Sequence, residues 1–364
     1  MVRIAGLIFA IGLLLAGGPA ALAAQPAVSA ASYLLMESRT GQVLLAHHGY
    51  EKRPPASTTK ILTCITALDL ADPDELVTVS PNADRVGDAT IYLSAGEIFD
   101  LRSLLQGALI KSGNDATVAI AEQVAGNEKL FMDLMNRKAR ILGATQTEFY
   151  NPHGLPHPQH LTTAFDLALI TRYAMKNEEF AAIVRTKEQV ISSFNSRRRV
   201  YLVNTNKLLW RNPEVIGVKT GTTNAAGMCL VSAAERDGRG LIAVVLKSRD
   251  RYTDAEKLLN WGFDEFTWVT LAEELGLMVV DVAGGIPSCV TVQPAYEAAW
   301  AVPKGERVEV EVELETPLRP PLHRGETVGK VTVRLKGQEL ENVPLVAGED
   351  VKLHRPQAFR LFGN

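Results

Sequence analysis

Three apolar segments joined by short connections constrain the fold of this chain more than any other feature. They are VIGVKTGTT (215–223), GMCLVSAAER (227–236) and GLIAVVLKS (240–248), and their composition is typical of β-strands. The connections are short and rich in glycine, which implies that neighbouring strands are antiparallel. The sequence therefore predicts an antiparallel sheet that contains these three strands.

The chain before these strands is predicted to contain a hairpin and several helices. SYLLMESRTGQVLLAHHG (32–49) has two apolar runs on either side of the turn Arg39-Thr40-Gly41, which predicts a β-hairpin. Thr163-x-x-Asp166 resembles a helix-capping box with Asp in place of Glu. Helices that flank an antiparallel sheet predict an α+β domain. Helical spacing of apolar residues is found at 57–70, 101–110, 115–125, 128–141 and 252–262.

The composition changes near residue 275, where a second domain is predicted to begin. RVEVEVELE (307–315) and TVGKVTVRLKGQELENVPLVAG (327–348) alternate between apolar and polar residues. This alternation predicts a small antiparallel β domain over residues 276–364. Because these residues include no cluster of reactive side chains, we expect a mechanical role, as a pedestal, a partner surface or a spacer from a membrane.

The first residues, 1–24, are predicted to be a secretory signal peptide. Arg3 supplies a positive start, residues 4–16 form a short apolar run, and Ala21-Leu22-Ala23 is typical of a cleavage site. An uncleaved N-terminal anchor is the alternative. We therefore expect an exported protein of the cell envelope, in the periplasm or on the extracytoplasmic face, whose first domain covers residues 25–275.

Charge and hydropathy limit the partners of this chain. The 38 basic and 41 acidic residues give a net charge of −3, so there is no reason to expect nucleic-acid binding. After residue 24 no apolar stretch has the length of a membrane span. The C-terminal segment RPQAFRLFGN (355–364) offers few apolar contacts, so a membrane surface is predicted to be bound weakly or not at all.

Cysteines and histidines form no pattern that predicts a disulfide framework, a metal site or a cofactor. The three cysteines are interpreted as small buried residues, with a Cys64–Cys229 bridge as the alternative. The histidines of residues 153–160 match no standard helical zinc motif, and the nearby prolines disfavour a helix there. The residues concerned are Cys64, Cys229, Cys289, His153, His157 and His160.

Ser57 and Lys60, in RPPASTTKIL (53–62), are the first candidate catalytic pair. Two prolines hold the chain extended before a helix that is predicted to begin near Ala56 or Ser57. Residues three apart on a helix lie about 5–6 Å apart at their Cβ atoms, so the lysine amine can reach the serine oxygen. A serine hydroxyl needs an adjacent base to act as a nucleophile, and the free N–H groups of a helix N-terminus favour an oxyanion beside it.

A lysine base imposes a condition on the rest of the site. A free lysine titrates near ~10.4 and a useful base near ~7, so the pKa of Lys60 must fall by about 3.4, or about 4–5 kcal/mol. Burial together with a second cation supplies such a change, so another lysine should lie in the site. Taken alone, the pair indicates only a capped helix with a solvated lysine.

Ser112-Gly113-Asn114 is the second candidate motif and one of three Ser-x-Asn sequences in the chain. It lies between two helical segments, where a short loop can present both side chains to a cleft. Its alternative role is structural, because Asn114 or Asp115 can cap the helix that follows.

Lys219-Thr220-Gly221 is the third candidate motif and lies on the first of the three serial strands. Glycine inside a strand indicates a close approach by another backbone or by a ligand. Alternation along an ideal strand sends Lys219 and Thr220 to opposite sides. A bulge or a twist at Gly221 would let both side chains reach one site.

Ser-x-x-Lys, Ser-x-Asn and Lys-Thr-Gly occur here in the order found in penicillin-binding proteins and class A β-lactamases. The chain resembles the low-molecular-mass penicillin-binding proteins that act as serine-type D-alanyl-D-alanine carboxypeptidases. The resemblance covers roughly residues 30–265 and, more weakly, the β-rich C-terminal domain. It implies a β-lactamase/transpeptidase-like domain followed by a small all-β domain. It is carried by RPPASTTKILT, LIKSGNDA, FYNPHGLPHPQHLTTAFDLALI and GVKTGTTNAAGMCLVSAAERDGRGLIAVVL.

The resemblance also implies a reaction. Ser57 would attack the peptide carbonyl between the two terminal D-alanines of a peptidoglycan stem pentapeptide, and Lys60 would take its proton. Ser112 would relay a proton to the leaving amine, and water would then hydrolyse the acyl-enzyme. Lys219 would be the second cation that a lysine base requires. β-Lactam antibiotics would bind covalently to the same serine as inhibitors.

The remaining motif residues would bind the substrate. Asn114 would hold the substrate backbone and Lys60, Lys219 would supply positive charge, and Thr220 would bind the terminal carboxylate. The backbone N–H groups of Ser57 and Thr222 would form the oxyanion hole, with Gly221 beside them.

Three other activities are weighed against this interpretation. A class A β-lactamase needs a glutamate that activates water, and the surroundings of Glu148 do not resemble the loop that carries it. A peptidoglycan D,D-endopeptidase shares every motif and stays open. A non-catalytic envelope binding protein is disfavoured because the motif residues are intact.

Overall fold

The computed structural model describes residues 24–354, which form two compact units. The first is Ala24–Asp264, and the second begins at Glu265. The change of composition near residue 275 lies further along the chain than this division. Nearly all of the predicted signal peptide (1–24) and the whole segment 355–364 lie outside the described residues.

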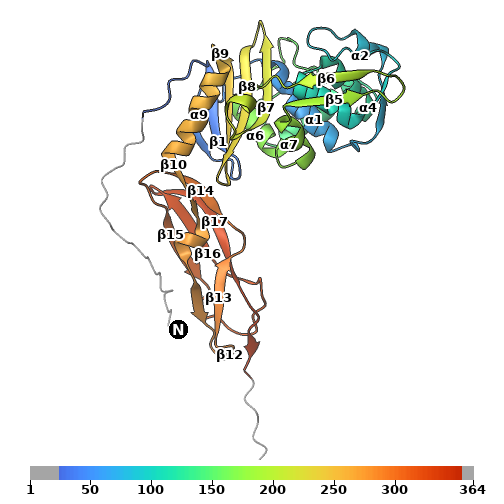
Figure 1. Ribbon diagram of the computed structural model, residues 1–364. Helices are drawn as coiled ribbons and strands as arrows, with labels where there is room; N and C mark the ends of the chain where they lie inside the picture. The colour runs from blue at the N-terminus through green and yellow to red at the C-terminus, as the bar shows by residue number, and fades with distance from the viewer. Residues whose placement is uncertain (1–23, 355–364) are drawn as a thin grey trace, which may run out of the picture. The chain divides into compact units, whose positions relative to one another are not determined.

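An antiparallel sheet forms the centre of the first unit, with the strand order β2-β1-β9-β8-β7 (Figure 1). The predicted hairpin and the three serial strands are confirmed, and β1 joins the two groups by pairing with β9. The strands are β1 Ser32–Glu37, β2 Val43–His47, β7 Val215–Thr223, β8 Gly227–Arg236 and β9 Arg239–Ser248.

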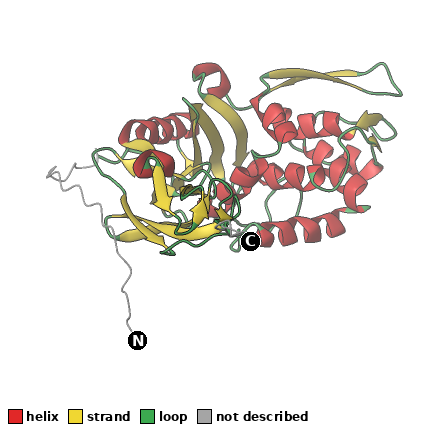
Figure 2. Cartoon of the chain, turned by 90° about the horizontal axis from the view of Figure 1, so that it is seen from below, coloured by secondary structure: helices red, strands yellow, loops and turns green. Residues whose placement is uncertain are grey.

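Helices make up much of the rest of this unit, and Figure 2 shows most of them gathered in one cluster beside the sheet. The predicted helices are confirmed, and α6 begins after Thr163, whose side chain accepts a hydrogen bond from the Asp166 N–H as the capping sequence predicts. The helices are α1 Lys60–Leu68, α2 Pro81–Arg85, α3 Leu101–Gln106, α4 Asn114–Ala125, α5 Glu128–Ile141, α6 Ala164–Ala174, α7 Glu178–Arg185, α8 Leu208–Arg211 and α9 Arg251–Glu265, with a 3-10 turn η1 at Ala56–Thr59 and a π turn η2 at Gly107–Lys111.

Both faces of the central sheet are covered. Leu34 of β1 belongs to the apolar core that α1 and α6 share. Leu35 points to the opposite face because side chains alternate along a strand. Helix α9 packs there at Gly262, where a Cβ would lie 2.6 Å from Leu35. Two short strand pairs were not predicted: β3 Leu76–Thr78 with β4 Ile98–Asp100, and β5 Glu188–Ser192 with β6 Arg199–Val203.

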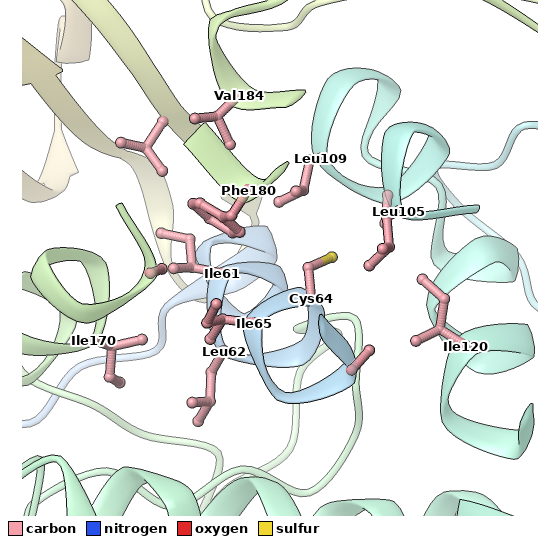
Figure 3. Packing of buried hydrophobic residues seen from close by; sticks show 14 of the residues in the cluster. Ile61, Leu62, Cys64, Ile65, Leu105, Leu109, Ile120, Ile170, Phe180 and Val184 are labelled. Carbon is pink, nitrogen blue, oxygen red and sulfur yellow. The ribbon is translucent and has the colours of Figure 1, made fainter. Parts of the chain in front are cut away.

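Helix α1 lies in the middle of the first unit, and each of its residues from Lys60 to Ala67 is buried. Figure 3 shows its apolar side chains between those of α6 and α7 on one side and those of α3, η2 and α4 on the other. A helix held on all sides in this way gives the residues of its first turn fixed positions. The flanking side chains include Leu105, Leu109, Ile120, Ile170, Phe180 and Val184.

The second unit is the predicted small β domain. Its main sheet is antiparallel, with the strand order β11-β13-β17-β16-β15. The core of the unit is rich in valine. No helix within residues 24–354 is both long and apolar enough to cross a membrane. The elements are β10 Phe266–Thr270, α10 Leu271–Leu275, β11 Met278–Asp281, β12 Gly285–Ile286, β13 Cys289–Pro294, β14 Ala299–Pro303, β15 Glu309–Leu314, β16 Thr327–Leu335, β17 Gln338–Ala347 and β18 Lys352–Leu353.

The cysteines differ in part from the prediction. Cys64 and Cys229 are buried as expected, whereas Cys289 is half-exposed because it lies at the start of β13, close to a turn. All three are free thiols, so the alternative of a Cys64–Cys229 bridge is wrong.

Candidate active site

The turn that precedes α1 presents Ser57. Residues 55–60 are buried except for Ser57, which is half-exposed at the surface of the first unit. The turn begins at Ala56, whose φ of +49° is in the left-handed region that residues with a Cβ rarely adopt. Ser57 thus lies in the first helical turn, as predicted, on a backbone that is strained one residue before it.

The amine of Lys60 is surrounded by three oxygens. Its Nζ lies 3.0 Å from Ser57 Oγ, 2.7 Å from Asn114 Oδ1 and 2.8 Å from the backbone oxygen of His153. The orientation of the Asn114 amide is fixed, because its Nδ2 donates to the carbonyl of Gly87. Asn114 and His153, which follow Lys60 in the chain by 54 and 93 residues, therefore contact the same nitrogen.

A neutral Lys60 amine satisfies all three contacts. The oxygens of Asn114 and His153 can only accept, so they take the two N–H groups of an uncharged amine. The nitrogen lone pair then remains for the third contact, in which the Ser57 hydroxyl donates. In this arrangement the amine is already the acceptor of the serine proton, which is the geometry that a general base requires.

The electrostatics of the site favour that neutral form. Burial lowers the pKa of Lys60 well below its usual value, and the charge of Lys219 lowers it further. Burial also lowers the pKa of Lys219 to about 7, with a further contribution from Arg251. Cys64, one turn after Lys60, is a neutral thiol because burial raises its pKa to about 12. Lys219 is therefore a second basic group whose charge lowers the pKa of Lys60, which is the condition stated above for a lysine base.

Strand β7 carries Lys219, Thr220 and Gly221 past the nucleophile. A Cβ added at Gly221 would lie 2.9 Å from the backbone nitrogen of Ser57, which confirms the predicted close approach at this glycine. The Thr220 hydroxyl hydrogen-bonds to the Thr205 hydroxyl at 2.7 Å, and Lys219 Nζ donates to the Thr220 carbonyl at 3.0 Å.

Of the two possibilities given for Gly221, a bulge or a twist, the bulge is wrong. Pairing of β7 with β8 is regular from Gly217 to Thr223, and the register shift lies earlier, between Val215 and Gly217. Lys219 and Thr220 are both buried without a bulge between them, and η1, α7 and η2 all pack against β7.

Arg251 is a site residue that the sequence analysis missed. Its guanidinium donates to the carbonyl of Gly221 at 2.9 Å and to the Thr222 hydroxyl at 2.7 Å. It therefore adds a positive charge beside β7, next to the exposed Thr222. No local motif marks it, because it comes from the start of α9, and only the packing of α9 against the sheet brings it here.

Ser112 lies at the end of η2, two residues before Asn114. Its φ of +72° is left-handed, and it ends a π turn, a feature that is frequent at functional sites. Among the residues that the structure describes, its hydroxyl makes no hydrogen bond to Ser57 or Lys60. Gly113 is the N-cap of α4 and the cap makes no side-chain hydrogen bond, so the alternative in which Asn114 or Asp115 is the cap is wrong.

The loop between α5 and α6 contributes more than turn geometry. His153 supplies the carbonyl that Lys60 contacts, and Gly154 follows it with a φ of +91°. Burial lowers the pKa values of His153 and His160 to about 3, so both imidazoles are neutral at physiological pH. His157 stacks on Tyr150 at the surface of this loop.

Comparison with known proteins identifies the family. Residues 20–250 match the family model described as D-alanyl-D-alanine carboxypeptidase. The chain belongs to this family of serine peptidases. Residues 280–353 match the model of the penicillin-binding protein 5 C-terminal domain, which agrees with the separate β unit.

Curated relatives and solved structures agree with this membership. D-alanyl-D-alanine carboxypeptidase DacC of Escherichia coli is 35% identical over 92% of this chain and 88% of its own length. DacF of Bacillus subtilis is 32% identical over 93% and 92%, respectively. Penicillin binding protein 5 from Haemophilus influenzae superposes with a TM-score of 0.76 at 30% identity, covering 90% of this chain and 99% of that protein.

Proposed function

We propose that this carboxypeptidase removes the terminal D-alanine from peptidoglycan stem pentapeptides through an acyl-enzyme on Ser57. The observation that carries the proposal is the contact of Lys60 Nζ with Ser57 Oγ at 3.0 Å, while Asn114 Oδ1 and the His153 carbonyl lie within hydrogen-bond distance of the same nitrogen. Lys60 accepts the Ser57 proton, and the serine oxygen attacks the carbonyl between the two D-alanines. The tetrahedral intermediate collapses, releases D-alanine and leaves an ester that water hydrolyses.

In this proposal the free carboxylate of the substrate is recognised by the β7 side of the site. Lys219 and Arg251 supply positive charge, and Thr220 supplies a hydroxyl. A carboxylate between these groups raises the pKa of Lys219, because an opposite charge favours its protonated form. Substrate binding therefore keeps Lys219 charged while Lys60 stays neutral, so the two lysines serve different roles.

The oxyanion and the leaving group are assigned to backbone and hydroxyl groups. The N–H groups of Ser57 and Thr222 form the oxyanion hole, and the close approach of β7 at Gly221 supports this pairing. Loss of one such donor typically costs about 10²–10³ in rate. Ser112 carries the proton to the departing amine, and Asn114 holds Lys60 and the substrate backbone.

The same serine is proposed to bind β-lactams covalently, because these inhibitors present a reactive carbonyl to the same nucleophile.

The catalytic chemistry belongs to residues 25–275 and the mechanical role to residues 276–364. We further propose export, with residues 1–24 as the signal peptide, and weak or no attachment to a membrane surface by residues 355–364. Glu148 is exposed and its backbone pairs with Leu161, which does not support a class A β-lactamase.

A digest of a synthetic stem pentapeptide tests the function. Mass spectrometry should show the loss of one D-alanine with the wild type and no loss with Ser57→Ala. Labelled penicillin should mark the wild type and not the variant. A cross-linked peptide dimer that is cleaved faster than the pentapeptide would instead identify a D,D-endopeptidase. The proposal would be overturned if the wild type released no D-alanine from the pentapeptide and was not labelled by penicillin.

A further inference from the structure

His160 is a buried residue that the reaction as described does not use. It is 2% exposed and its ring stacks on Phe149, with ring centroids 4.6 Å apart. Its Nδ1 accepts the backbone N–H of Tyr150 at 3.1 Å, and its Nε2 lies 2.9 Å from Thr59 Oγ1. Both ring nitrogens are therefore engaged by named partners.

The direction of these hydrogen bonds follows from a count of protons. Thr59 Oγ1 lies 2.8 Å from the carbonyl of Ala56, which can only accept, so the threonine proton is used there. The contact between Thr59 and His160 must then use the proton of His160 Nε2. The imidazole is held as the neutral tautomer with its proton on Nε2, because Nδ1 is already an acceptor.

The chain of hydrogen bonds ends on the strained peptide that precedes the nucleophile. The oxygen of Ala56 and the N–H of Ser57 belong to one planar peptide and point in opposite directions when it is trans. Fixing the Ala56 oxygen on Thr59 therefore directs the Ser57 N–H away from α1, toward β7 at Gly221. A Cβ at Gly154 would lie 1.9 Å from the Ala56 oxygen, so this glycine leaves room for the arrangement.

We propose that His160 is a positioning residue that, through Thr59, holds the Ala56–Ser57 peptide in its left-handed turn and thereby aims the Ser57 N–H at the developing oxyanion. The inference rests on the proposed function, since it assigns a purpose to that N–H. The residue contacts neither Ser57 nor the reacting atoms. It acts by keeping a conformation that alanine would otherwise leave.

Two substitutions of His160 separate its two hydrogen bonds. The side-chain amide of His160→Gln reaches the place of Nε2 and keeps a donor for Thr59. The shorter amide of His160→Asn reaches only the place of Nδ1 and keeps the acceptor for Tyr150. We expect His160→Asn to lower kcat and the rate of penicillin acylation by about 10–100-fold with KM within about threefold, and His160→Gln to lose clearly less.

Thr59 offers a second, independent test with a matched control. Thr59→Val removes the hydroxyl without changing the shape and should reproduce the loss seen with His160→Asn, whereas Thr59→Ser should retain at least about half of the activity. Thr66→Val is the control, because Thr66 of α1 is also buried and, within residues 24–354, its hydroxyl has no hydrogen-bond partner. It should leave acylation within about twofold of wild type.

A measurement on the unmodified protein does not depend on whether variants fold. In the ¹⁵N spectrum of the imidazoles, His160 should show a protonated Nε2, an unprotonated Nδ1 and no titration between about pH 5 and 8. A proton on Nδ1, or titration in this range, would overturn the proposal. So would His160→Asn and Thr59→Val proteins that acylate at the wild-type rate.

These results are distinct from a failure of the proposed function. If the wild type releases no D-alanine, the function is wrong whatever the variants do. If the wild type is active and the folded variants are equally active, the function stands and the positioning role is wrong. If Thr66→Val loses as much as Thr59→Val, the loss comes from α1 packing and the positioning role is again wrong.

Discussion

The two compact units bury different kinds of side chain. The first unit buries the amines of Lys60 and Lys219 and the carboxylate of Asp115 at 0%, 1% and 1% exposure. In the described part of the second unit, Thr332 is the one buried residue with a polar side chain. Burying a charge is costly unless it is compensated, so the first unit gives up stability to hold a reactive site, and the second has no such cost.

The comparison teaches how folding lowers the pKa of a buried lysine. The folded first unit buries two amines away from water, and the pKa of each falls because the charged forms are poorly solvated there. The described core of the second unit consists of valine, leucine, alanine and tryptophan and contains no amine. Replacing a buried amine of the first unit should therefore lower activity and raise stability. Shortening a core side chain of the second unit should lower stability and leave activity unchanged.

The largest expected effect is on activity in the first unit. Lys60→Met removes the base and should lower the rate of penicillin acylation by about 10²–10⁴-fold. The same substitution should raise thermal stability, because a buried amine is replaced by an apolar chain of similar length. Stopped-flow acylation and a melting curve measure the two effects. The exposed Lys111→Met is the control, and a destabilised Lys60→Met protein would contradict the comparison.

The second effect is on stability alone, in the other unit. Leu345 of β17 is fully buried, so Leu345→Ala should destabilise that unit by about 2–5 kcal/mol. Because the unit holds none of the candidate site residues, acylation of Ser57 should change by less than about twofold. Denaturant unfolding and labelled-penicillin kinetics check both. The highly exposed Leu277→Ala should change neither, and a large loss of acylation with Leu345→Ala would show that the units are coupled.

The third effect sharpens the stability cost of the site. The pKa of Lys219 is lowered from 10.5 to about 7. At any pH below 10.5, folding must therefore either remove its proton or bury its charge, and both lower the stability of the folded state. Each pKa unit corresponds to about 1.36 kcal/mol, and after allowance for lost contacts Lys219→Met should stabilise the protein by about 2–4 kcal/mol at pH 7. The gain should shrink as the pH rises from 7 toward 10.5 and vanish above that value, where the amine is neutral in both states. Urea unfolding at pH 7 and pH 10 tests the trend, and an equal gain at both pH values would contradict it.

The smallest effect is on the pH dependence of activity. Lys60 must lose its proton to act as a base, so kcat/KM should rise with pH on the acid side. Lys219 loses its positive charge as the pH rises through its lowered pKa of about 7, so kcat/KM should fall on the alkaline side by up to about tenfold per pH unit. The fall in kcat should lie at higher pH, because bound substrate stabilises the charge. Lys219→Arg should move the alkaline limb upward, and an unchanged limb would assign it to another group.

The local sequence determined most of the secondary structure of the first unit. The serial strands at 215–248, the hairpin at 32–49 and the helices follow from apolar periodicity and short connections, which act between near neighbours. The Ser57–Lys60 contact is equally local, since three residues on a helical turn fix it. The need for a second lysine also followed from the sequence, because it is a condition on a pKa and not on a position.

Only the tertiary structure decided what surrounds that pair. The carbonyl of His153, the guanidinium of Arg251 and the hydrogen bond from His160 to Thr59 come from segments whose distance along the chain carries no signal. They meet because α1 is packed on all sides and β7 passes beside its first turn, so their placement depends on the whole core. The bulge that was one of two possibilities at Gly221 is wrong, since the pairing of β7 is regular there and Lys219 and Thr220 are buried without it.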